Sequence, residues 1–244
     1  MSGDTPVPDA TDETDAALAA EIETILASFT RYHPDRIELS LDRMYRLLSD
    51  LGDPHLALPP VIHIAGTNGK GSTAAFLAAA LEIAGKRVSV YTSPHLLRLN
   101  ERYHVAGAPL DNVALLQLFE EIDATNAGKS ITEFEITTAA ALLAMARAPA
   151  DIVILETGLG GRCDATNVIA KPAATVITRI GLDHMDFLGP DIAAIAAEKA
   201  AIQKRDVPSI VAPQDPVAAA VIADAARSIG APSIEAGEVF QVIA

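Results

Sequence analysis

Apolar side chains recur along this chain at two spacings, and the two spacings predict alternating strands and helices. Short continuous apolar runs, typical of buried parallel strands, occupy Val61–Ala65, Arg87–Thr92, Asp151–Thr157, Ala174–Thr178 and Ser209–Ala212. Segments with helical spacing occupy Leu18–Phe29, Ile37–Leu51, Ser72–Ala84, Asn112–Ala127, Glu135–Arg147, Ile192–Ile202 and Val217–Ile229. The alternation predicts an α/β fold of the P-loop type, with a doubly wound, mostly parallel sheet and helices on both faces.

The two ends of the chain depart from this pattern. Residues 1–17 contain no basic residue and several acidic ones, Asp4, Asp9, Asp12, Glu13 and Asp15. We therefore expect a disordered acidic tail over residues 1–17, followed by one domain over residues 18–244 that opens with helices within residues 18–52. The chain ends in the apolar run Val239–Ala244. Because a natural terminus is usually more solvated, we expect that the sequence is cut short.

Composition and charge narrow the class of protein. The 244 residues carry a net charge of −14 with a pI near 4.7, which disfavours nucleic acids and membrane surfaces as partners. The sequence contains neither the basic start and apolar run of a secretory signal nor the roughly 18 apolar residues of a spanning helix. The single cysteine, Cys163, excludes an internal disulfide. These features predict a soluble, cytoplasmic protein with local basic sites for anions.

The segment VIHIAGTNGKGS joins the first predicted strand to the helix after it through a glycine-rich turn. Gly66, Gly69 and Gly71 lack side chains, so backbone N–H groups can close on an anion at the positive end of the helix. Lys70 adds a positive charge, and Ser72 offers a hydroxyl that can reach Mg²⁺. The usual P-loop pattern G-x-x-x-x-G-K-[ST] is met except that Gly71 separates the lysine from the hydroxyl residue. We expect this segment to bind phosphate.

Charged residues follow two further predicted strands. Glu156 ends an apolar run, where an acid can hold nucleotide-bound Mg²⁺ or cap the next segment. His184, with Asp183 beside it, follows the next run and fits either a metal ligand or a structural histidine. Lys199 by itself fits an exposed helix lysine, and Arg162 fits an anion site and a surface salt bridge equally well. Because the carboxyl ends of parallel strands share one edge, Glu156 and His184 are expected to lie near each other.

Several motifs occur in order from about Ile37 to the end of the chain, each on the element predicted for it. They are Gly66–Ser72, Thr92–Leu96 with Asn100–Arg102, Phe134-Glu135, Glu156–Arg162 with Asp164–Asn167, Leu182–His184 and Glu198–Ala200. Together they resemble the folylpolyglutamate synthase/dihydrofolate synthase family within the Mur ligase superfamily. A glycine between the lysine and the hydroxyl residue is a feature of this family.

The resemblance implies an ATP-dependent ligase that joins the carboxylate of a pteroate or folate to the amine of L-glutamate. ATP would first phosphorylate the carboxylate, and the amine would then attack the acyl phosphate and release phosphate. The resemblance also implies a monomer with small-molecule partners, namely ATP, L-glutamate and dihydropteroate or folate. Members of this family are expected to carry a second, carboxy-terminal domain, so this Mur-ligase-like ATP-binding domain could bind phosphate and metal without catalysis.

The same resemblance implies roles for individual residues. ATP would be bound by Thr67, Asn68, Gly69, Lys70, Gly71 and Ser72. Mg²⁺ would be held by Ser93, Glu156, His184 and Lys199, the lysine as a carbamate formed with CO₂, which supplies oxygen donors. Catalysis would depend on Lys70, His184 and Lys199. The pterin or folate would contact Glu38, Leu39, Ser40, His95, Thr132, Glu133, Phe134, Glu135, Arg162, Cys163, Asp164 and Ala165. Cys163 stands where the family varies, and we do not expect it to be catalytic.

Other functions stay open from the sequence. One is a Mur-type peptidoglycan ligase, which uses the same acyl-phosphate chemistry on a nucleotide-sugar peptide. Another is a truncated ATP-binding module without turnover. The Ser-Pro-His-Leu and Thr-Glu-Phe-Glu segments favour folate over peptidoglycan precursors. A P-loop kinase or GTPase is disfavoured by Gly71 and by a strand that ends in Glu156 rather than aspartate. The choice between dihydropteroate and tetrahydrofolates is not readable from the sequence.

Overall fold

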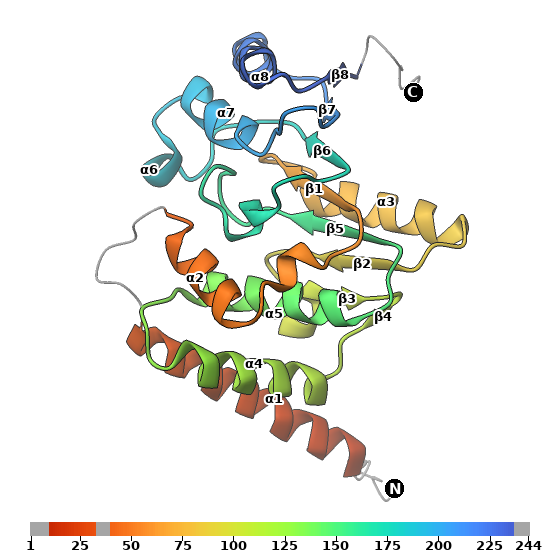
Figure 1. Ribbon diagram of the computed structural model, residues 1–244, viewed down its shortest axis with the longest axis vertical. Helices are drawn as coiled ribbons and strands as arrows, with labels where there is room; N and C mark the ends of the chain where they lie inside the picture. Colours follow the sequence, from red (N-terminus) through yellow and green to blue (C-terminus); the bar gives the residue numbers. More distant parts are fainter. Residues whose placement is uncertain (1–9, 33–39, 237–244) are drawn as a thin grey trace, which may run out of the picture.

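A computed structural model describes residues 10–32 and 40–236, and the strands in these residues form a single sheet. Its eight strands lie in the order β4-β3-β2-β5-β1-β6-β7-β8 (Figure 1). The run from β2 to β8 is parallel, whereas β3 and β4 join the edge in antiparallel fashion. The prediction of a mostly parallel α/β sheet is therefore confirmed.

Each apolar run predicted as a strand forms one. The strands are β1 (Val61–Ala65), β2 (Val88–Tyr91), β3 (Tyr103–Val105), β4 (Ala108–Pro109), β5 (Ile152–Glu156), β6 (Ala174–Ile177), β7 (Ser209–Val211) and β8 (Ser233–Glu235). In the centre of the sheet His63 of β1 is aligned with Leu155 of β5 and with Thr175 of β6. These three side chains therefore point to the same face.

The helices follow the predicted segments closely. The α-helices are α1 (Ala10–Phe29), α2 (Asp42–Asp50), α3 (Lys70–Ile83), α4 (Asn112–Asn126), α5 (Glu133–Arg147), α6 (Met185–Leu188), α7 (Ile192–Ala200) and α8 (Pro216–Ile229). Short 3₁₀ helices are η1 (Thr30–Tyr32), η2 (Pro54–Leu56), η3 (Leu99–Arg102) and η4 (Ala165–Val168). None of the helices in residues 10–32 and 40–236 is long and apolar enough to cross a membrane.

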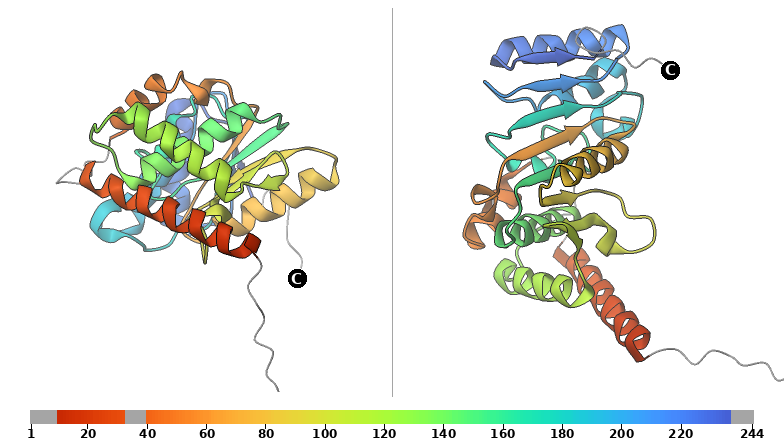
Figure 2. Two further views of the ribbon diagram at one scale, coloured as in Figure 1. Left: turned by 90° about the horizontal axis from the view of Figure 1, so that it is seen from below. Right: turned by 90° about the vertical axis from the view of Figure 1, so that its right-hand side faces the viewer.

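Helices cover both faces of the sheet, but unequally (Figure 2). On one face, Ala74 of α3 packs against Ile64, Val88 and Ile154. The other face carries α2 and α5 over β1, β2 and β5, and α7 and α8 over β6 and β7. Helix α4 packs on α5, and α1 packs on α4. The larger core therefore lies on the α5 side of the sheet.

The expectation of disorder over residues 1–17 is wrong for Ala10–Ala17, because α1 begins at Ala10. Residues 1–9 lie outside the described part of the chain. Further along α1, Ile22, Leu26 and Phe29 are buried.

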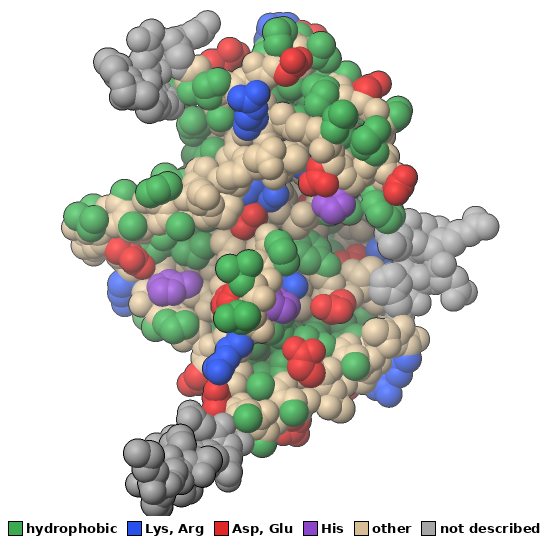
Figure 3. All heavy atoms as spheres, turned by 180° about the vertical axis from the view of Figure 1, so that it is seen from behind, with side chains coloured by type: hydrophobic (Ala, Val, Ile, Leu, Met, Phe, Trp, Pro, Cys, Tyr) green, Lys and Arg blue, Asp and Glu red, His purple; other side chains and the backbone are tan. Residues whose placement is uncertain are grey.

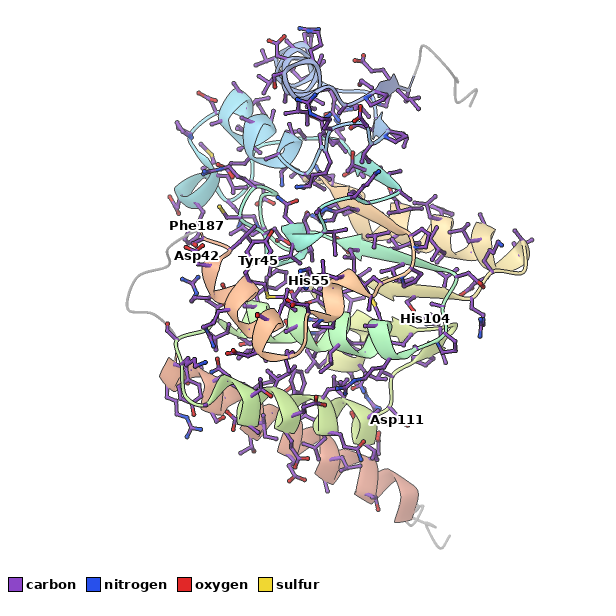
Figure 4. The ribbon with its side chains drawn as sticks, viewed as in Figure 1. Asp42, Tyr45, His55, His104, Asp111 and Phe187 are labelled. Atoms are coloured by element: carbon purple, nitrogen blue, oxygen red, sulfur yellow. The ribbon has the colours of Figure 1, made fainter. Side chains whose placement is uncertain are left out.

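Helix α2 begins later than predicted. The sequence pattern starts at Ile37, but residues 33–39 lie outside the described part, and the helix begins at Asp42. The hydroxyl of Ser40 accepts a hydrogen bond from the backbone N–H of Asp42 at 3.0 Å, a local turn that competes with helix. After α2, the rings of Tyr45 and His55 meet edge to face with centroids 6.2 Å apart, which joins α2 to η2 (Figure 4).

Candidate active site

The loops that follow β1, β2, β5 and β6 meet at the carboxyl edge of the parallel strands, where α/β proteins bind ligands. Glu156 at the end of β5 accepts a hydrogen bond from the backbone N–H of Ser93 at 3.4 Å. Lys70 Nζ lies 3.9 Å from Glu156 Oε1. A cavity of about 420 Å³ beside α3 is lined by Gly71, Ser93 and Glu156 among others. Residues from α3, from β5 and from the loop after β2 therefore line one hollow.

The glycine loop after β1 is held tightly against the loop after β6. The backbone N–H groups of Thr67 and Asn68 both donate to the Arg179 carbonyl at 3.1 Å. Gly66 has φ +150°, and a Cβ atom there would lie 1.8 Å from Thr178 Oγ1, so only glycine fits. Gly69 has φ +86° and leads directly into α3. The helix begins at Lys70, and the N–H groups of a first helical turn have no partner within the helix and can bind an anion.

Glu156 is a buried acid beside a partly buried lysine. The side chains of Glu156 and Lys70 are 5% and 15% exposed. Burial raises the pKa of Glu156, while the charge of Lys70 and the Ser93 amide oppose that rise. An ionised carboxylate in this position is an oxygen donor of the kind that Mg²⁺ prefers.

Lys199 does not behave as an exposed helix lysine. It is 3% exposed, and its Nζ donates to the Gly66 carbonyl at 2.9 Å. Burial lowers the pKa of Lys199 to about 8, and the charge of Lys70 adds to the effect. A lysine with such a pKa is partly an uncharged amine near neutral pH, and only the amine is nucleophilic.

The sequence left Arg162 open between an anion site and a salt bridge, and in the structure it forms a salt bridge. Its Nε and Nη2 donate to Glu198 Oε1 at 3.0 and 2.8 Å. The backbone N–H of Arg162 also donates to the Glu198 carbonyl at 2.9 Å. Since Glu198 precedes Lys199, this pair ties the loop after β5 to α7.

His184, another predicted metal ligand, lies just before α6. It has φ +47°, its side chain is half-exposed, and its Nε2 lies 3.5 Å from Asp183 Oδ2. No hydrogen bond or ion pair joins His184 to Glu156 within the described residues. In the same part of the chain no three or more His, Cys, Asp or Glu side chains gather as a metal site. The structure thus brings Lys70, Ser93 and Glu156 together, without His184.

The predicted substrate segment Thr132–Glu135 starts α5. The Thr132 hydroxyl accepts from the backbone N–H of Glu135 at 3.2 Å, and Glu135 Oε2 accepts from the backbone N–H of Thr132 at 2.8 Å. Arg43 Nε also donates to Glu135 Oε2, at 3.1 Å. Glu135 therefore caps the helix and holds α2, whereas Glu133 is exposed. The ring of Phe134 packs so closely on Gly158 that a Cβ atom there would lie 2.2 Å from it.

Asp164 turns inward rather than toward the hollow. Its Oδ2 accepts from the backbone N–H groups of Gly158 and Leu159 at 2.8 Å each, and its Oδ1 accepts from the N–H and hydroxyl of Thr166. Burial raises the pKa of Asp164. Next to it, Ala165 is buried and Cys163 is a half-buried free thiol. Of the early substrate residues, Ser40 starts the turn before α2, while Glu38 and Leu39 lie outside the described residues.

Glu101, which lies within the motif Asn100–Arg102 but for which no particular role was predicted, organises the loop after β2. Glu101 accepts hydrogen bonds from the backbone N–H groups of Leu96, Leu97 and Arg98 at 2.7, 2.9 and 2.8 Å. His95, a predicted substrate contact, accepts from Arg102 at 3.0 Å through Nδ1. The sequence contains a local indication of this role, because Glu101 follows Arg98 by three residues, the spacing of a capping box.

Comparison with known proteins assigns the fold to a family. A family model described as the Mur ligase middle domain matches residues 64–238, from within β1 to beyond β8. The chain belongs to the Mur ligase middle-domain family. This match confirms the superfamily expected from the sequence motifs.

Several curated relatives of this Mur ligase domain are dihydrofolate synthase/folylpolyglutamate synthases. The Escherichia coli protein is 42% identical over 213 residues, covering 87% of this chain and 50% of the relative. The Bacillus subtilis protein is 45% identical over 204 residues, covering 80% and 47%. The chain therefore spans about half the length of these relatives.

Solved structures agree with this assignment. E. coli FolC in complex with DHPP and ADP superposes with a TM-score of 0.83 at 40% identity, covering 90% of this chain and 52% of that one. A bifunctional folylpolyglutamate synthase/dihydrofolate synthase with Mn, AMPPNP and L-glutamate bound gives a TM-score of 0.79 at 39% identity, covering 88% and 51%. About nine tenths of the chain, and not the glycine loop alone, thus shares the fold of these proteins.

Proposed function

We propose that this chain is the nucleotide-binding part of an ATP-dependent ligase that joins L-glutamate to dihydropteroate, to a tetrahydrofolate or to both through an acyl phosphate. The observation that carries the proposal is the ion pair of Lys70 with Glu156 at the start of α3, beside a hollow that Glu156, Gly71 and Ser93 line, within a Mur ligase domain. Proteins that share this fold and about 40% of its residues are named for that reaction.

The residues of the chain have distinct tasks in this proposal. Residues Thr67 to Ser72 hold the ATP phosphates, and Lys70 stabilises the negative charge that moves during phosphoryl transfer. Ser93 and Glu156 offer oxygen donors that suit Mg²⁺, which would neutralise charge on the phosphates when bound. His184, whose Nε2 lies 3.5 Å from Asp183 Oδ2, is proposed as a further ligand.

Lys199 is proposed as the carbamate that completes the metal ligands. Its amine would attack CO₂, forming the N–C bond and releasing one proton, so that a cation becomes an anionic oxygen donor. The burial of Lys199 and its pKa of about 8 favour this reaction, since the amine form is available. Its hydrogen bond to the Gly66 carbonyl places it directly behind the glycine loop.

The carbamate has a direct test. With ¹³C-labelled bicarbonate, we expect the wild type to show a protein-bound carbamate signal in ¹³C NMR that is absent from Lys199→Arg. The control is Lys204→Arg, since Lys204 is also a lysine whose pKa is lowered by burial. A signal that persists in Lys199→Arg, or disappears in Lys204→Arg, contradicts the assignment.

The residues that contact the pteroate or folate are also part of this proposal. Phe134 and the loop after β5 lie close together and form one wall. Along with Ser40, His95, Thr132 and Cys163 they are proposed to face the pteroate ring system. Arg162 and Glu135 are held by Glu198 and Arg43, so we propose that they shape this wall rather than bind the substrate directly.

The deciding experiment measures ATP-dependent phosphate release by this chain with Mg²⁺ and bicarbonate. Dihydropteroate plus L-glutamate is compared with either substrate omitted, and Lys70→Met is the control for ATP binding. Release that requires both substrates supports the complete ligase. Release that occurs with UDP-muramoyl substrates instead supports the peptidoglycan alternative.

A nucleotide-binding module without turnover is the second candidate, because the chain spans about half the length of its relatives. ATP binding that depends on Lys70, with no phosphate release, is the result expected for it. Loss of ATP binding in the wild type itself contradicts both candidates. A monomeric state and a cytoplasmic location stay predictions, which sedimentation and cell fractionation can check.

A further inference from the structure

A histidine lies in the middle of the central strand, where the chain is otherwise apolar. His63 of β1 is completely buried and points to the α5 side of the sheet. Its Nε2 lies 2.8 Å from the hydroxyl of Thr166 in η4. Neither residue lines the hollow beside α3, so the phosphate chemistry does not explain a buried polar pair. Burying an imidazole in a strand costs free energy unless it has a partner and a role.

The direction of these hydrogen bonds follows from the number of protons available. The Thr166 hydroxyl has one proton, which it donates to Asp164 Oδ1. It can therefore only accept from His63, and Nε2 of His63 must carry the hydrogen. Burial lowers the pKa of His63 to about 3, so the ring is neutral. Its Nδ1 is then an acceptor, and it has no hydrogen-bond partner among the described residues.

Asp164 links the His63–Thr166 pair to the loop after β5 through further hydrogen bonds. Its second carboxylate oxygen accepts from the backbone N–H groups of Gly158 and Leu159 at 2.8 Å each. Gly158 in turn lies against the ring of Phe134. One chain of contacts thus runs from the strand that leads into the glycine loop to the wall proposed for the pteroate ring.

We propose that His63 is a positioning residue for the substrate: through the Thr166 hydroxyl and the Asp164 carboxylate it fixes the loop at Gly158 against Phe134 in the shape that binds a pteroate ring. This inference rests on the proposed function and deepens it. Direct contact with substrate is not required of His63. The Nε2–H donor matters because without it the Thr166 hydroxyl could turn its single proton toward the ring and away from the Asp164 carboxylate.

The first test removes the link without changing its shape. Thr166→Val deletes the hydroxyl that joins His63 to Asp164. The matched control is Thr24→Val, which deletes an exposed hydroxyl hydrogen bond to Ala20 on α1, away from the site. Measurements are the dissociation constants of dihydropteroate and of ATP, and the amide hydrogen exchange of the loop after β5.

Thr166→Val removes the two buried hydrogen bonds of the hydroxyl, to His63 and to Asp164. We expect it to weaken dihydropteroate binding about 5- to 30-fold and to change ATP binding less than about 2-fold. The amides of Gly158 and Leu159 should exchange faster by a similar factor, whereas Thr24→Val should change none of these values. Equal weakening of both ligands indicates general damage and overturns the proposal, as does unchanged exchange in Thr166→Val.

A second pair of variants separates positioning from packing. His63→Gln keeps an N–H donor and should retain dihydropteroate affinity within about 3-fold, whereas His63→Leu keeps volume without the donor and should resemble Thr166→Val. If both variants bind equally well, the donor is irrelevant and the proposal fails. If the wild type binds neither dihydropteroate nor a tetrahydrofolate, the proposed function is overturned, and the exchange of Gly158 and Leu159 alone decides whether His63 positions the loop.

Discussion

A neutral histidine inside the central strand should tie the stability of this protein to pH. The pKa of His63 is about 3 in the folded state, against 6.5 for an unperturbed histidine. Between these values the unfolded chain binds a proton that the folded chain does not, so stability falls as the pH falls below 6.5. We expect the free energy of unfolding to drop by about 1.4 kcal/mol per pH unit more in the wild type than in His63→Gln.

Urea unfolding of both proteins at pH 7, 6, 5 and about 4.5 measures this difference. The two curves of stability against pH should run parallel above about pH 7 and converge or cross below it. Curves that stay parallel down to the lowest pH would show that His63 is protonated in the folded protein.

Two glycines of the phosphate loop should differ sharply in their tolerance of a methyl group. At Gly66 a Cβ atom would lie 1.8 Å from Thr178 Oγ1, whereas at Gly69 no atom lies within 4 Å of it. Gly66→Ala should therefore cost about 2–4 kcal/mol of stability through the clash, and Gly69→Ala about 1–2 kcal/mol through its positive φ alone. Thermal and urea unfolding measure both, and similar losses would contradict the close approach at Gly66.

At the scale of single residues, the sequence predicted best those features that depend on neighbouring residues in the chain. Lys70 and Glu156 were predictable together because the carboxyl ends of parallel strands meet at one edge. The contact between Arg43 and Glu135 joins residues 92 positions apart, and no local sequence pattern predicts it. His63 was missed as well, because the apolar run around it predicts a strand correctly but does not indicate its polar partner, Thr166, which lies 103 residues further along the chain.

At the scale of elements, the start of α5 offers a test of whether a helix cap also serves the site. Thr132→Ala removes the acceptor of the Glu135 N–H. Asp111→Ala does the same at the start of α4, where Asp111 Oδ1 accepts from the Ala114 N–H at 2.8 Å (Figure 4). Each should lower stability by about 1 kcal/mol.

Only Thr132→Ala should also weaken dihydropteroate binding, because its helix carries Phe134 to the proposed wall. Calorimetric titration of the two variants, compared with the wild type, measures the effect. A loss of affinity that is equal in both variants would mean that the α5 cap has no special connection with the substrate.

Elements were predicted well where they are long or strongly apolar. β1 has the predicted bounds, and α8 begins one residue before the prediction. β8 (Ser233–Glu235) was missed because its short segment carries little apolar pattern and pairs only with β7. The edge hairpin of β3 and β4 was likewise too short to be recognised as part of the sheet. Tertiary pairing, rather than local preference, creates these strands.

At the scale of the whole molecule, the two faces of the sheet are covered to different extents. Helix α3 is apolar nearly all round, yet Ala74 is its only fully buried residue within the described chain. Phe76 and Ile83 are 78% and 89% exposed. Figure 3 shows hydrophobic side chains along this projecting helix. A helix that is apolar nearly all round is usually buried. The α3 face therefore exposes an apolar surface of the kind that promotes self-association.

The exposure of α3 leads to the last prediction. The double variant Phe76→Gln/Ile83→Gln should change the free energy of unfolding by less than about 0.5 kcal/mol, because neither side chain is packed. It should also self-associate less than the wild type over a concentration series in sedimentation velocity, and bind less of a hydrophobic dye. The control Leu56→Gln removes a side chain that is 72% exposed on η2, away from α3, and should leave self-association unchanged. A large loss of stability in the double variant would mean that the α3 face is covered in solution, since only a buried side chain contributes that much.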